Sequence, residues 1–452
     1  MPPFSQGLDR IGVAFDDDHA VANAGLLLPA TLAPRLGLRA LVDQHLDLGT
    51  TPGRAHVGLK AMTVVAAMLA GGDSIDDAEV LRAGATQAVL GHQLRAPSTL
   101  GTFLRSLTYG PVRQLDAVSR MALQRAWAAG AGPGADAMTM DVDSTICQVY
   151  GPAKQGAAFG STRVRGYHPL LATRAGHGDV LHARLRGGRA NSVRGAASLL
   201  RETFARVRGA GASRPLTLRA DSGFSAYTVV RTCCWAGVVF SITVRLNPAL
   251  HRTIAAVPVD TWIPIPYWSS TGTFGVDATG APISGADVAE TVYVPCGTPL
   301  RLSLRRVRPT PDSQLAPFIE FAYHAFITDR AGDTLTREAD HRAHADVETV
   351  IRDLKEGAGL AHLPLGRFAA NAAWLALAVT AHNLSRWVTA LGLPDTVPAR
   401  TATPTLRRWL FGVPGRLTPS ARRWTLHLPR GWPWQARFTA AVRQLRALRV
   451  VC

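Results

Sequence analysis

The chain has 452 residues, of which 47% are hydrophobic, and its formal net charge is +17. A chain of this length exceeds one ordinary hydrophobic core, so we expect two to four domains. The positive charge favours a polyanionic partner, such as nucleic acid or an anionic membrane surface. Because 46 of the 49 basic residues are Arg, a bias in genome composition is the alternative explanation of this charge.

The cysteines and the hydropathy pattern argue against several classes of protein. The five cysteines show no C-x-x-C spacing, which disfavours a structural zinc site, and their odd number disfavours a disulfide framework. The N-terminus lacks the charged start and apolar run of a signal peptide. The most apolar helix candidate, 372–381, is far shorter than a membrane span. We therefore expect a cytoplasmic, nucleoid-associated protein with no membrane partner. The cysteines are Cys147, Cys233, Cys234, Cys296 and Cys452.

Residues 1–135 are predicted to be mostly helical. An apolar helix over 61–69 is closed by two glycines, and the Pro-Ser-Thr triplet at 97–99 begins another helix. We expect a DNA-binding or dimerisation domain here, and a plain packing domain explains these helices equally well. The segment AAGAGPG at 128–134 predicts a linker after this domain.

From residue 136 the hydrophobic periodicity changes to that of an α/β fold. The order of elements, β-β-β-α-β-α-β, predicts the first half of an RNase H-like mixed sheet over residues 136–246. In that fold the first and fourth strands lie side by side, so their ends bring two side chains together. The predicted strands are 138–143, 167–175, 179–185, 216–221 and 237–245, and the predicted helices are 192–207 and 225–235.

Three further regions complete the predicted organisation. Residues 247–318 are rich in Pro, Gly, Thr and Val and are predicted to form a β-rich insertion. Residues 319–395 contain a strand and two helices and are predicted to form the second half of the core. The C-terminal region, 396–452, holds 11 arginines and no Asp or Glu, with tryptophans interleaved. This composition suits contact with phosphates and bases, or a basic subdomain with a tryptophan core.

Three carboxylates are the candidate catalytic residues. Asp143 and Asp221 end two predicted strands, and Glu348 lies on a predicted amphipathic helix. Two strand-end aspartates and a helical glutamate can hold two hard cations, an arrangement used to cut and join phosphodiesters. The alternative for Glu348 is an ordinary surface ion pair with Arg352, four residues on.

Taken in order, these motifs resemble the DDE transposases of bacterial insertion sequences. The nearest resemblance is to the thirteen-eighty family, a relative of the family-four group. Glu348 and Lys355 match the last two positions of the family-four signature, but His341 and His344 stand where it has Tyr and Arg. Other matching segments are RGYHPL at 165–170, DSGF at 221–224, NAAWL at 371–375 and HNL at 382–384.

The resemblance implies a function, a cofactor and partners. Asp143, Asp221 and Glu348 would coordinate two Mg²⁺ ions, for which Mn²⁺ would substitute. The enzyme would bind the terminal inverted repeats of its element as double-stranded DNA, nick the element ends, and transfer the freed 3′ ends to target DNA. It would act as a homodimer when two ends are synapsed.

Several basic and aromatic residues are candidates for contact with DNA. On the catalytic helix and in the C-terminal region, arginine and lysine side chains are placed to hold phosphates. Three aromatic residues of the predicted insertion, Trp262, Tyr267 and Trp268, are candidates to stack on a flipped base or to form local core. The predicted DNA contacts are Lys154, Arg165, Tyr167, His344, Arg352, Lys355, Arg407, Arg408, Arg422 and Arg423.

Three alternatives remain open from the sequence. Asp141, two residues before Asp143, lies on the same strand face and can replace it as the first metal ligand. The same segment fits the opening motif of haloacid dehalogenase phosphatases, with Asp141 as nucleophile and Asp143 as acid–base. The later acidic motif of those enzymes is out of order here. A transposase-derived DNA-binding protein without catalysis is the third alternative.

Overall fold

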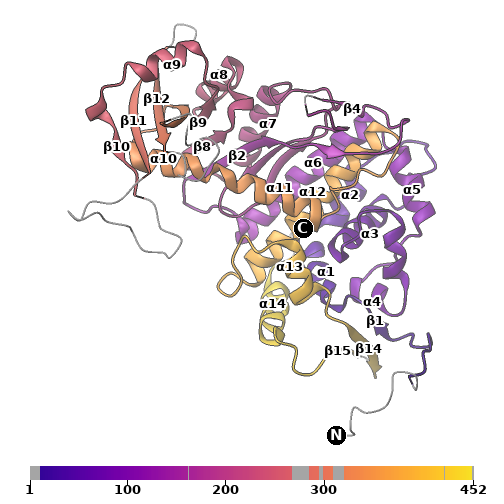
Figure 1. Cartoon of the computed structure of the whole chain (residues 1–452). Coiled ribbons are helices and arrows are strands. Elements are labelled where there is room, and N and C mark those ends of the chain that lie inside the picture. Colours follow the sequence, from indigo (N-terminus) through magenta and orange to yellow (C-terminus); the bar gives the residue numbers. More distant parts are fainter. Residues whose placement is uncertain are drawn as a thin grey trace.

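The computed structural model describes residues 11–160, 162–266, 285–294, 299–308, 320–421 and 423–449. Its centre is a nine-stranded mixed sheet in the order β10-β11-β12-β13-β9-β8-β2-β6-β7. The N-terminal helices and the C-terminal elements lie together at one end of this sheet, and β10, β11 and β12 lie at the other (Figure 1).

The core of the sheet has the predicted RNase H-like α/β architecture. Its parallel strands β2, β8 and β9 are flanked by β6, which runs antiparallel to β2, and then by β7, which runs antiparallel to β6. The crossover from β7 to β8 is α7 (Ala196–Gly209), and that from β8 to β9 is α8 (Tyr227–Ala236). The strands are β2 (Met138–Ser144), β6 (Leu170–Arg174), β7 (Val180–Arg184), β8 (Leu216–Ala220) and β9 (Val239–Val244).

The residues between 247 and 318 extend this same sheet. After α9 (Pro248–Ala255), three strands of the segment add to the edge beyond β13, and all of these pairs are antiparallel. The β-rich character expected from composition is thus realised as a continuation of the core sheet. The strands are β10 (Ile263–Pro264), β11 (Ala286–Tyr293), β12 (Leu300–Val307) and β13 (Ala322–Thr328).

Three helices follow β13, namely α10 (Thr334–Arg342), α11 (Asp346–Gly357) and α12 (Phe368–Gly392). α12 is buried on nearly all sides, with Trp374 and Trp387 each about 1% exposed. It contacts β7 of the sheet, helices of the N-terminal region and a C-terminal helix. A helix that is apolar all round belongs in a protein core, and α12 joins three regions of the chain into one.

The N-terminal region is helical, as predicted. Pro97 lies in the first turn of the fifth helix, and Gly71 directly follows the third helix. Proline favours the start of a helix and glycine favours its end. The helices are α1 (Leu27–Arg35), α2 (Leu38–His45), α3 (Val57–Ala70), α4 (Thr86–Leu90), α5 (Pro97–Ser106) and α6 (Tyr109–Ala126). No single helix in the described ranges is long and apolar enough to span a membrane. The helices of Ala24–Arg35 and Leu38–His45, bent by 53°, pass that test only as a pair.

The two ends of the chain pack against each other. β1 (Ala20–Val21) pairs with β14 (Gly415–Ser420), which pairs with β15 (Arg423–His427) in a three-stranded sheet. α13 (Thr403–Leu406) contacts α11 and α12, and α14 (Gln435–Ala447) contacts α1 and α12. A second small sheet, not predicted, joins β3 (Cys147–Gln148), β4 (Ala158–Phe159) and β5 (Arg165–Tyr167).

Candidate active site

Asp143 and Asp221 leave the sheet at neighbouring strand ends. β2 and β8 pair in parallel with Val142 opposite Ala220, so the next residue of each strand is an aspartate at the same edge. Asp221 caps the short helical turn that follows β8, and its side chain accepts a hydrogen bond from Gly223 N at 3.0 Å. The prediction that the first and fourth strands are neighbours is confirmed.

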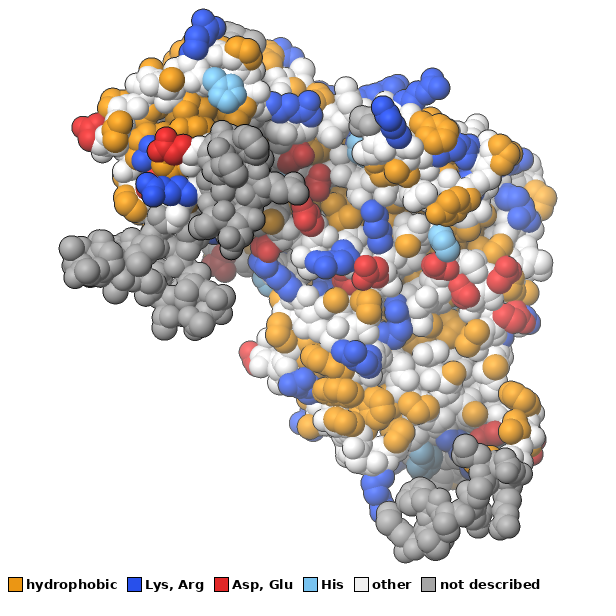
Figure 2. All heavy atoms as spheres, in the orientation of Figure 1, with side chains coloured by type: hydrophobic (Ala, Val, Ile, Leu, Met, Phe, Trp, Pro, Cys, Tyr) orange, Lys and Arg blue, Asp and Glu red, His pale blue; other side chains and the backbone are white. Residues whose placement is uncertain are grey.

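Glu348 reaches this edge from α11. The helix buries Val347, Ile351 and Leu354, as its hydrophobic spacing predicts. Glu348 therefore lies on the exposed side of the helix. In the described ranges it forms no ion pair with Arg352, so the surface-pair alternative is not realised. Figure 2 shows acidic side chains gathered in a recess over this part of the sheet, with basic side chains around them.

Lys355 fastens α11 to the strand that carries Asp143. Its ammonium group donates a hydrogen bond to the backbone carbonyl of Ile146, at 3.0 Å, in the segment that follows β2. Lys355 is half-buried there. The side chain thus sets the position of the glutamate-bearing helix relative to β2, whether or not it also contacts DNA.

The three carboxylates act on one another electrostatically. Burial, together with the negative charges of Asp221 and Glu348, raises the pKa of Asp143 to about 6, against a hydrogen bond from Ser144 N and the proximity of His344. Two carboxylates at the same site each disfavour ionisation of the other. Asp143, Asp221 and Glu348 are therefore brought together by the fold, although they are far apart in the sequence.

Asp141 has a different environment, although it lies on the same strand face. It is about 1% exposed, and the guanidinium of Arg219 donates to both of its oxygens, at 2.7 and 2.9 Å. His344 Nδ1 lies 2.9 Å from Asp141 Oδ1. A buried carboxylate whose oxygens are taken by an arginine and a histidine is a structural ion pair. Its geometry leaves no free oxygen for attack on a phosphoester, so the phosphatase alternative does not fit.

A comparison with protein-family models identifies the family of this chain. A family model described as "Transposase DDE domain group 1" matches residues 5–450. The chain belongs to this family of DDE transposases. A comparison with curated proteins gives no match. Among solved structures, a piggyBac transposase synaptic complex with hairpin DNA is similar at a TM-score of 0.44 and 12% identity, covering 87% of this chain and 81% of that one.

The donor set of this DDE domain fits divalent cations of the Mg²⁺ type. Oxygen ligands from carboxylates are those that hard cations prefer. Burial is the largest cause of the raised pKa of Asp143, and the negative charges of Asp221 and Glu348 add to it. The carboxylates do not form one tight group, because in the described ranges only Asp116, His182 and Glu202 bring three such ligand atoms within 4.8 Å of one another.

The Asp116, His182 and Glu202 cluster lies elsewhere, and three arginines neutralise its carboxylates. Arg206 donates to Asp116 at 2.9 Å, Arg184 to Glu202 at 2.8 and 2.9 Å, and Arg113 to Glu202 at 3.1 Å. A further cation there would meet three positive charges. We interpret the cluster as an ion-pair network that joins α6 to β7 and α7, which the sequence analysis missed.

Lys154 and Arg165, predicted to contact phosphates, both bind backbone carbonyls. The ammonium of Lys154 donates to Leu363 O, and the guanidinium of Arg165 donates to Gly151 O and, at 2.8 Å, to Pro152 O. These bonds hold the loop that follows β3. A DNA contact by either residue stays a prediction.

Tyr167 does not fit the predicted DNA contact. It is 0% exposed, its hydroxyl donates to Gln155 O at 2.7 Å, and it accepts from Asn371 at 3.2 Å. Its ring packs against Phe368 at a centroid distance of 5.9 Å. The prediction took the tyrosine for a surface residue because the neighbouring residues are basic. Its position in β5 turns it inward instead.

The predicted contacts of the C-terminal region divide into three cases. Arg407 donates to the carbonyls of Met68, Leu69 and Gly357 at 2.6–3.2 Å, so it joins the ends of α3 and α11 and is not free for DNA. Arg408 and Arg423 are exposed and stay candidates. Arg422 lies outside the described residues.

Among the candidates near the carboxylates, Arg352 is exposed, whereas His341 and His344 form hydrogen bonds with other residues of the protein. His341 hydrogen-bonds Ser241 and Thr243 through its two ring nitrogens and stacks on Phe326. Burial lowers the pKa of His341 to about 3, so it is neutral. Both ring nitrogens of His341 are thus taken by the protein, so it offers none to a phosphate. His344 uses Nδ1 for Asp141, and a DNA contact through its other ring nitrogen stays a prediction.

The aromatic candidates of the insertion are only partly described. Trp262 is half-buried and packs against Tyr323, with the guanidinium of Arg306 4.4 Å from its ring centroid. Trp262 therefore forms part of a local core, which was the alternative to stacking on a flipped base. Tyr267 and Trp268 lie outside the described residues.

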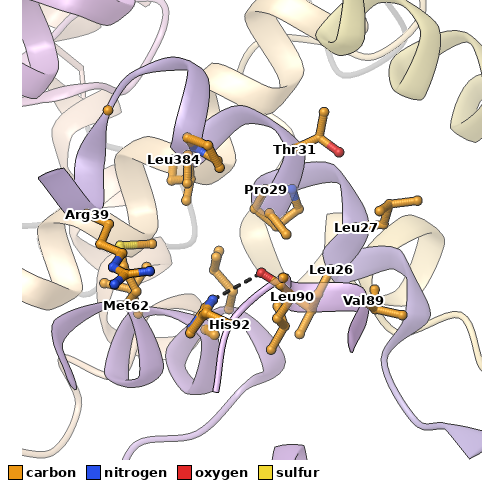
Figure 3. A pocket seen from close by; sticks show the side chains of 18 of the residues that line it. Leu26, Leu27, Pro29, Thr31, Arg39, Met62, Val89, Leu90, His92 and Leu384 are labelled. Carbon is orange, nitrogen blue, oxygen red and sulfur yellow. Dashed lines mark hydrogen bonds between the residues drawn. The ribbon is translucent and has the colours of Figure 1, made fainter. Parts of the chain in front are cut away.

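A separate cavity lies in the helical region, away from the carboxylates. It measures about 550 Å³ and is lined mainly by apolar side chains, among them Leu26, Pro29, Met62, Val89 and Leu90 (Figure 3). His92, at its wall, hydrogen-bonds Leu90 O at 3.0 Å. Its lining has none of the paired carboxylates that phosphodiester chemistry requires, so we do not assign catalysis to it.

Proposed function

We propose that this chain is a DNA transposase that binds the terminal inverted repeats of an insertion sequence and catalyses metal-dependent strand cleavage and strand transfer. The observation that carries the proposal is the placement of Asp143, Asp221 and Glu348 at one sheet edge, with no arginine partner among the residues that the structure describes. Membership of the DDE family supports it. Assignment to the thirteen-eighty family of bacterial elements is part of the proposal and rests on the motifs.

The residues of the site have distinct roles in this proposal. Asp143, Asp221 and Glu348 would hold two Mg²⁺ ions, with Mn²⁺ as a possible replacement. Such ions supply an activated water or 3′-hydroxyl and stabilise the leaving oxygen. The backbone amide of Ser144 orients Asp143, since it donates to Oδ1 at 2.6 Å. The hydrogen bond from Lys355 to Ile146 O keeps Glu348 at the site.

Asp143 rather than Asp141 is the first ligand in this proposal. Arg219 lies opposite Asp141 in the parallel register, two residues before Asp221, and neutralises it. This pairing fixes the ends of both strands and leaves Asp143 and Asp221, each two residues further on, to bind a cation. Arg219 is thus a positioning residue, and its spacing from Asp221 equals that of Asp141 from Asp143.

DNA recognition would use the excess positive charge. Arg352, Arg408 and Arg423 are exposed, and a guanidinium suits bidentate contact with phosphate. In the proposal the partners are the terminal repeats and the target duplex, the enzyme is a homodimer when two ends are synapsed, and it acts in the cytoplasm at the nucleoid.

A cleavage assay tests the proposed function. The full chain would be incubated with labelled DNA that carries the sequences flanking its own coding region, with Mg²⁺ or with a chelator. We expect metal-dependent cleavage, reduced by about a thousandfold or more in Asp221→Asn and Glu348→Gln, since each removes a charge that holds the ions. Glu356→Gln, on an exposed position of the same helix, is the matched control and should cleave normally.

Two outcomes would contradict the proposal. Equal cleavage by the wild type and by Asp221→Asn would mean that a contaminant or another site does the chemistry. Binding without any cleavage by the wild type would favour a DNA-binding protein that has lost catalysis.

A further inference from the structure

A groove of about 740 Å³ begins beside the candidate active site and runs along α8. One end is formed by Ser222 and Gly223, which directly follow Asp221. Ser192 also lines it, and the hydroxyl of Ser192 lies 3.1 Å from that of Ser144, the neighbour of Asp143. The groove therefore starts one residue from Asp221, and its lining residue Ser192 contacts the neighbour of Asp143.

Tyr227 and Arg231 of α8 line the groove, and Trp235 continues their row one helical turn beyond Arg231. Tyr227, Arg231 and Trp235 are spaced four residues apart, so they lie above one another on one helix face. The Arg231 guanidinium lies 5.3 Å from the ring centroid of Tyr227 and 4.6 Å from that of Trp235. Tyr227 is 56% exposed and Trp235 72% exposed. More than half of each aromatic side chain is exposed to solvent, so each ring has surface available for stacking.

The charge of the groove suits a polyanion. Its described lining contains Arg231 and Arg245 and no Asp or Glu. In the part of the chain that the structure describes, neither arginine is in a salt bridge. The remaining polar lining includes the side chains of Asn191 and Ser225. A positive groove with free aromatic faces is the combination that holds single-stranded nucleic acid, because every base has a face that can stack.

We propose that this groove holds unpaired nucleotides of the DNA strand that flanks the cut phosphodiester. The bases would stack on Tyr227 and Trp235, and Arg231 and Arg245 would pair with the phosphates. The inference rests on the proposed function, which supplies the DNA, but it names a separate surface. Bases within a duplex already stack on one another and present no free face to the protein. Exposed aromatic rings next to the scissile bond therefore suit bases of a separated strand.

Binding measurements in the presence of a chelator test this groove without any cleavage. Three labelled probes are compared: a blunt duplex, the same duplex with a single-stranded thymine extension of about ten nucleotides, and one with an abasic extension of equal length. The wild type should bind the thymine extension about tenfold or more tightly than the other two. The Tyr227→Ala/Trp235→Ala double variant should lose that preference, and Arg231→Gln should weaken binding of both extensions.

Matched variants control for surface and charge. Tyr109→Ala removes an aromatic that is 78% exposed on α6, and Arg82→Gln lowers the net charge by the same amount as Arg231→Gln. Both should keep the wild-type ratio of affinities for extended and blunt DNA. Near-ultraviolet circular dichroism of each variant checks that it is folded.

The outcomes distinguish a failure of the groove proposal from a failure of the proposed function. A wild type that binds the blunt and extended probes equally, or a double variant that keeps the preference, overturns the groove proposal alone. A double variant that alters only self-association identifies a second copy of the chain as the occupant and also overturns it. A wild type that binds none of the probes counts against the proposed function itself.

Discussion

Two acidic clusters on the same sheet differ in the charges that surround them. At the α6 interface, Asp116 and Glu202 lie among three arginines. At the ends of β2 and β8, the carboxylates of Asp143, Asp221 and Glu348 repel one another and have no arginine partner within the described ranges. The tighter cluster is the neutralised one.

The difference shows that short distances between ligand atoms do not by themselves identify a metal site. A carboxylate paired with a guanidinium is already compensated, and a cation would have to displace that partner. A carboxylate held near others without compensation raises the free energy of the fold until a cation binds. Neutralising substitutions should therefore lower the free energy of unfolding at the arginine-paired cluster and raise it at the other cluster.

The largest effect is expected from Asp116→Asn. Burial raises the pKa of Asp116, but the nearby His182 and the Arg206 guanidinium outweigh burial and hold it well below its usual value. Removing the carboxylate leaves the buried Arg206 unpaired, which should lower the free energy of unfolding by about 3–5 kcal/mol. Urea unfolding at neutral pH measures this. A loss below about 1 kcal/mol would mean that the network contributes little.

At the other cluster, Asp143→Asn should stabilise the metal-free protein. The substitution removes a poorly compensated charge whose pKa is raised to about 6. Two units of pKa correspond to about 3 kcal/mol at most, so we expect a gain of about 1–3 kcal/mol at neutral pH. Thermal unfolding with a chelator present measures it. Destabilisation by this variant would show that Asp143 has a structural partner, and the contrast between the clusters would disappear.

An intermediate effect is expected from Asp353→Asn, which acts at a third, compensated carboxylate. Burial raises the pKa of Asp353, but His382, Arg386 and the amide of Thr403 lower it to about 2. A lowered pKa stabilises the fold above the unfolded value of about 4, and this contribution of about 2 kcal/mol is lost as the pH falls from 4 to 2.

The pH dependence of stability provides the measurement. The difference in unfolding free energy between wild type and Asp353→Asn should be largest near neutral pH and should shrink below pH ~4. A difference that is constant with pH would place its origin in packing rather than in charge.

The smallest effect is expected from Tyr167→Phe. The substitution removes two hydrogen bonds of a buried hydroxyl and keeps the ring, so stability should fall by about 1 kcal/mol. Affinity for duplex DNA should stay at the wild-type value. Loss of affinity without loss of stability would restore the original prediction that Tyr167 contacts DNA.

The core of the fold was accessible from the sequence because its strands and helices carry local patterns. Strands predicted at 138–143 and 216–221 are observed at Met138–Ser144 and Leu216–Ala220, and their pairing follows from the element order. The inward face of α11 was visible in its helical spacing. Glu348 was therefore placed correctly on the outer face of that helix.

Pairings between distant charges were not accessible in the same way. Whether an aspartate is free or neutralised depends on a residue from another segment, as Arg219 is for Asp141 and Arg206 is for Asp116. Likewise, Arg407 looks like one of many surface arginines until α3 and α11 bring three carbonyls to it. Local patterns carry no information about such partners.

Binding of Mn²⁺ by the free protein, measured by electron paramagnetic resonance, tests the central claim most directly. The account predicts that wild type binds Mn²⁺ and that Asp143→Asn and Glu348→Gln each weaken this binding by about tenfold or more. Glu202→Gln, at the arginine-neutralised cluster, should bind like wild type. Binding that survives in Asp143→Asn and is lost in Glu202→Gln would contradict the account.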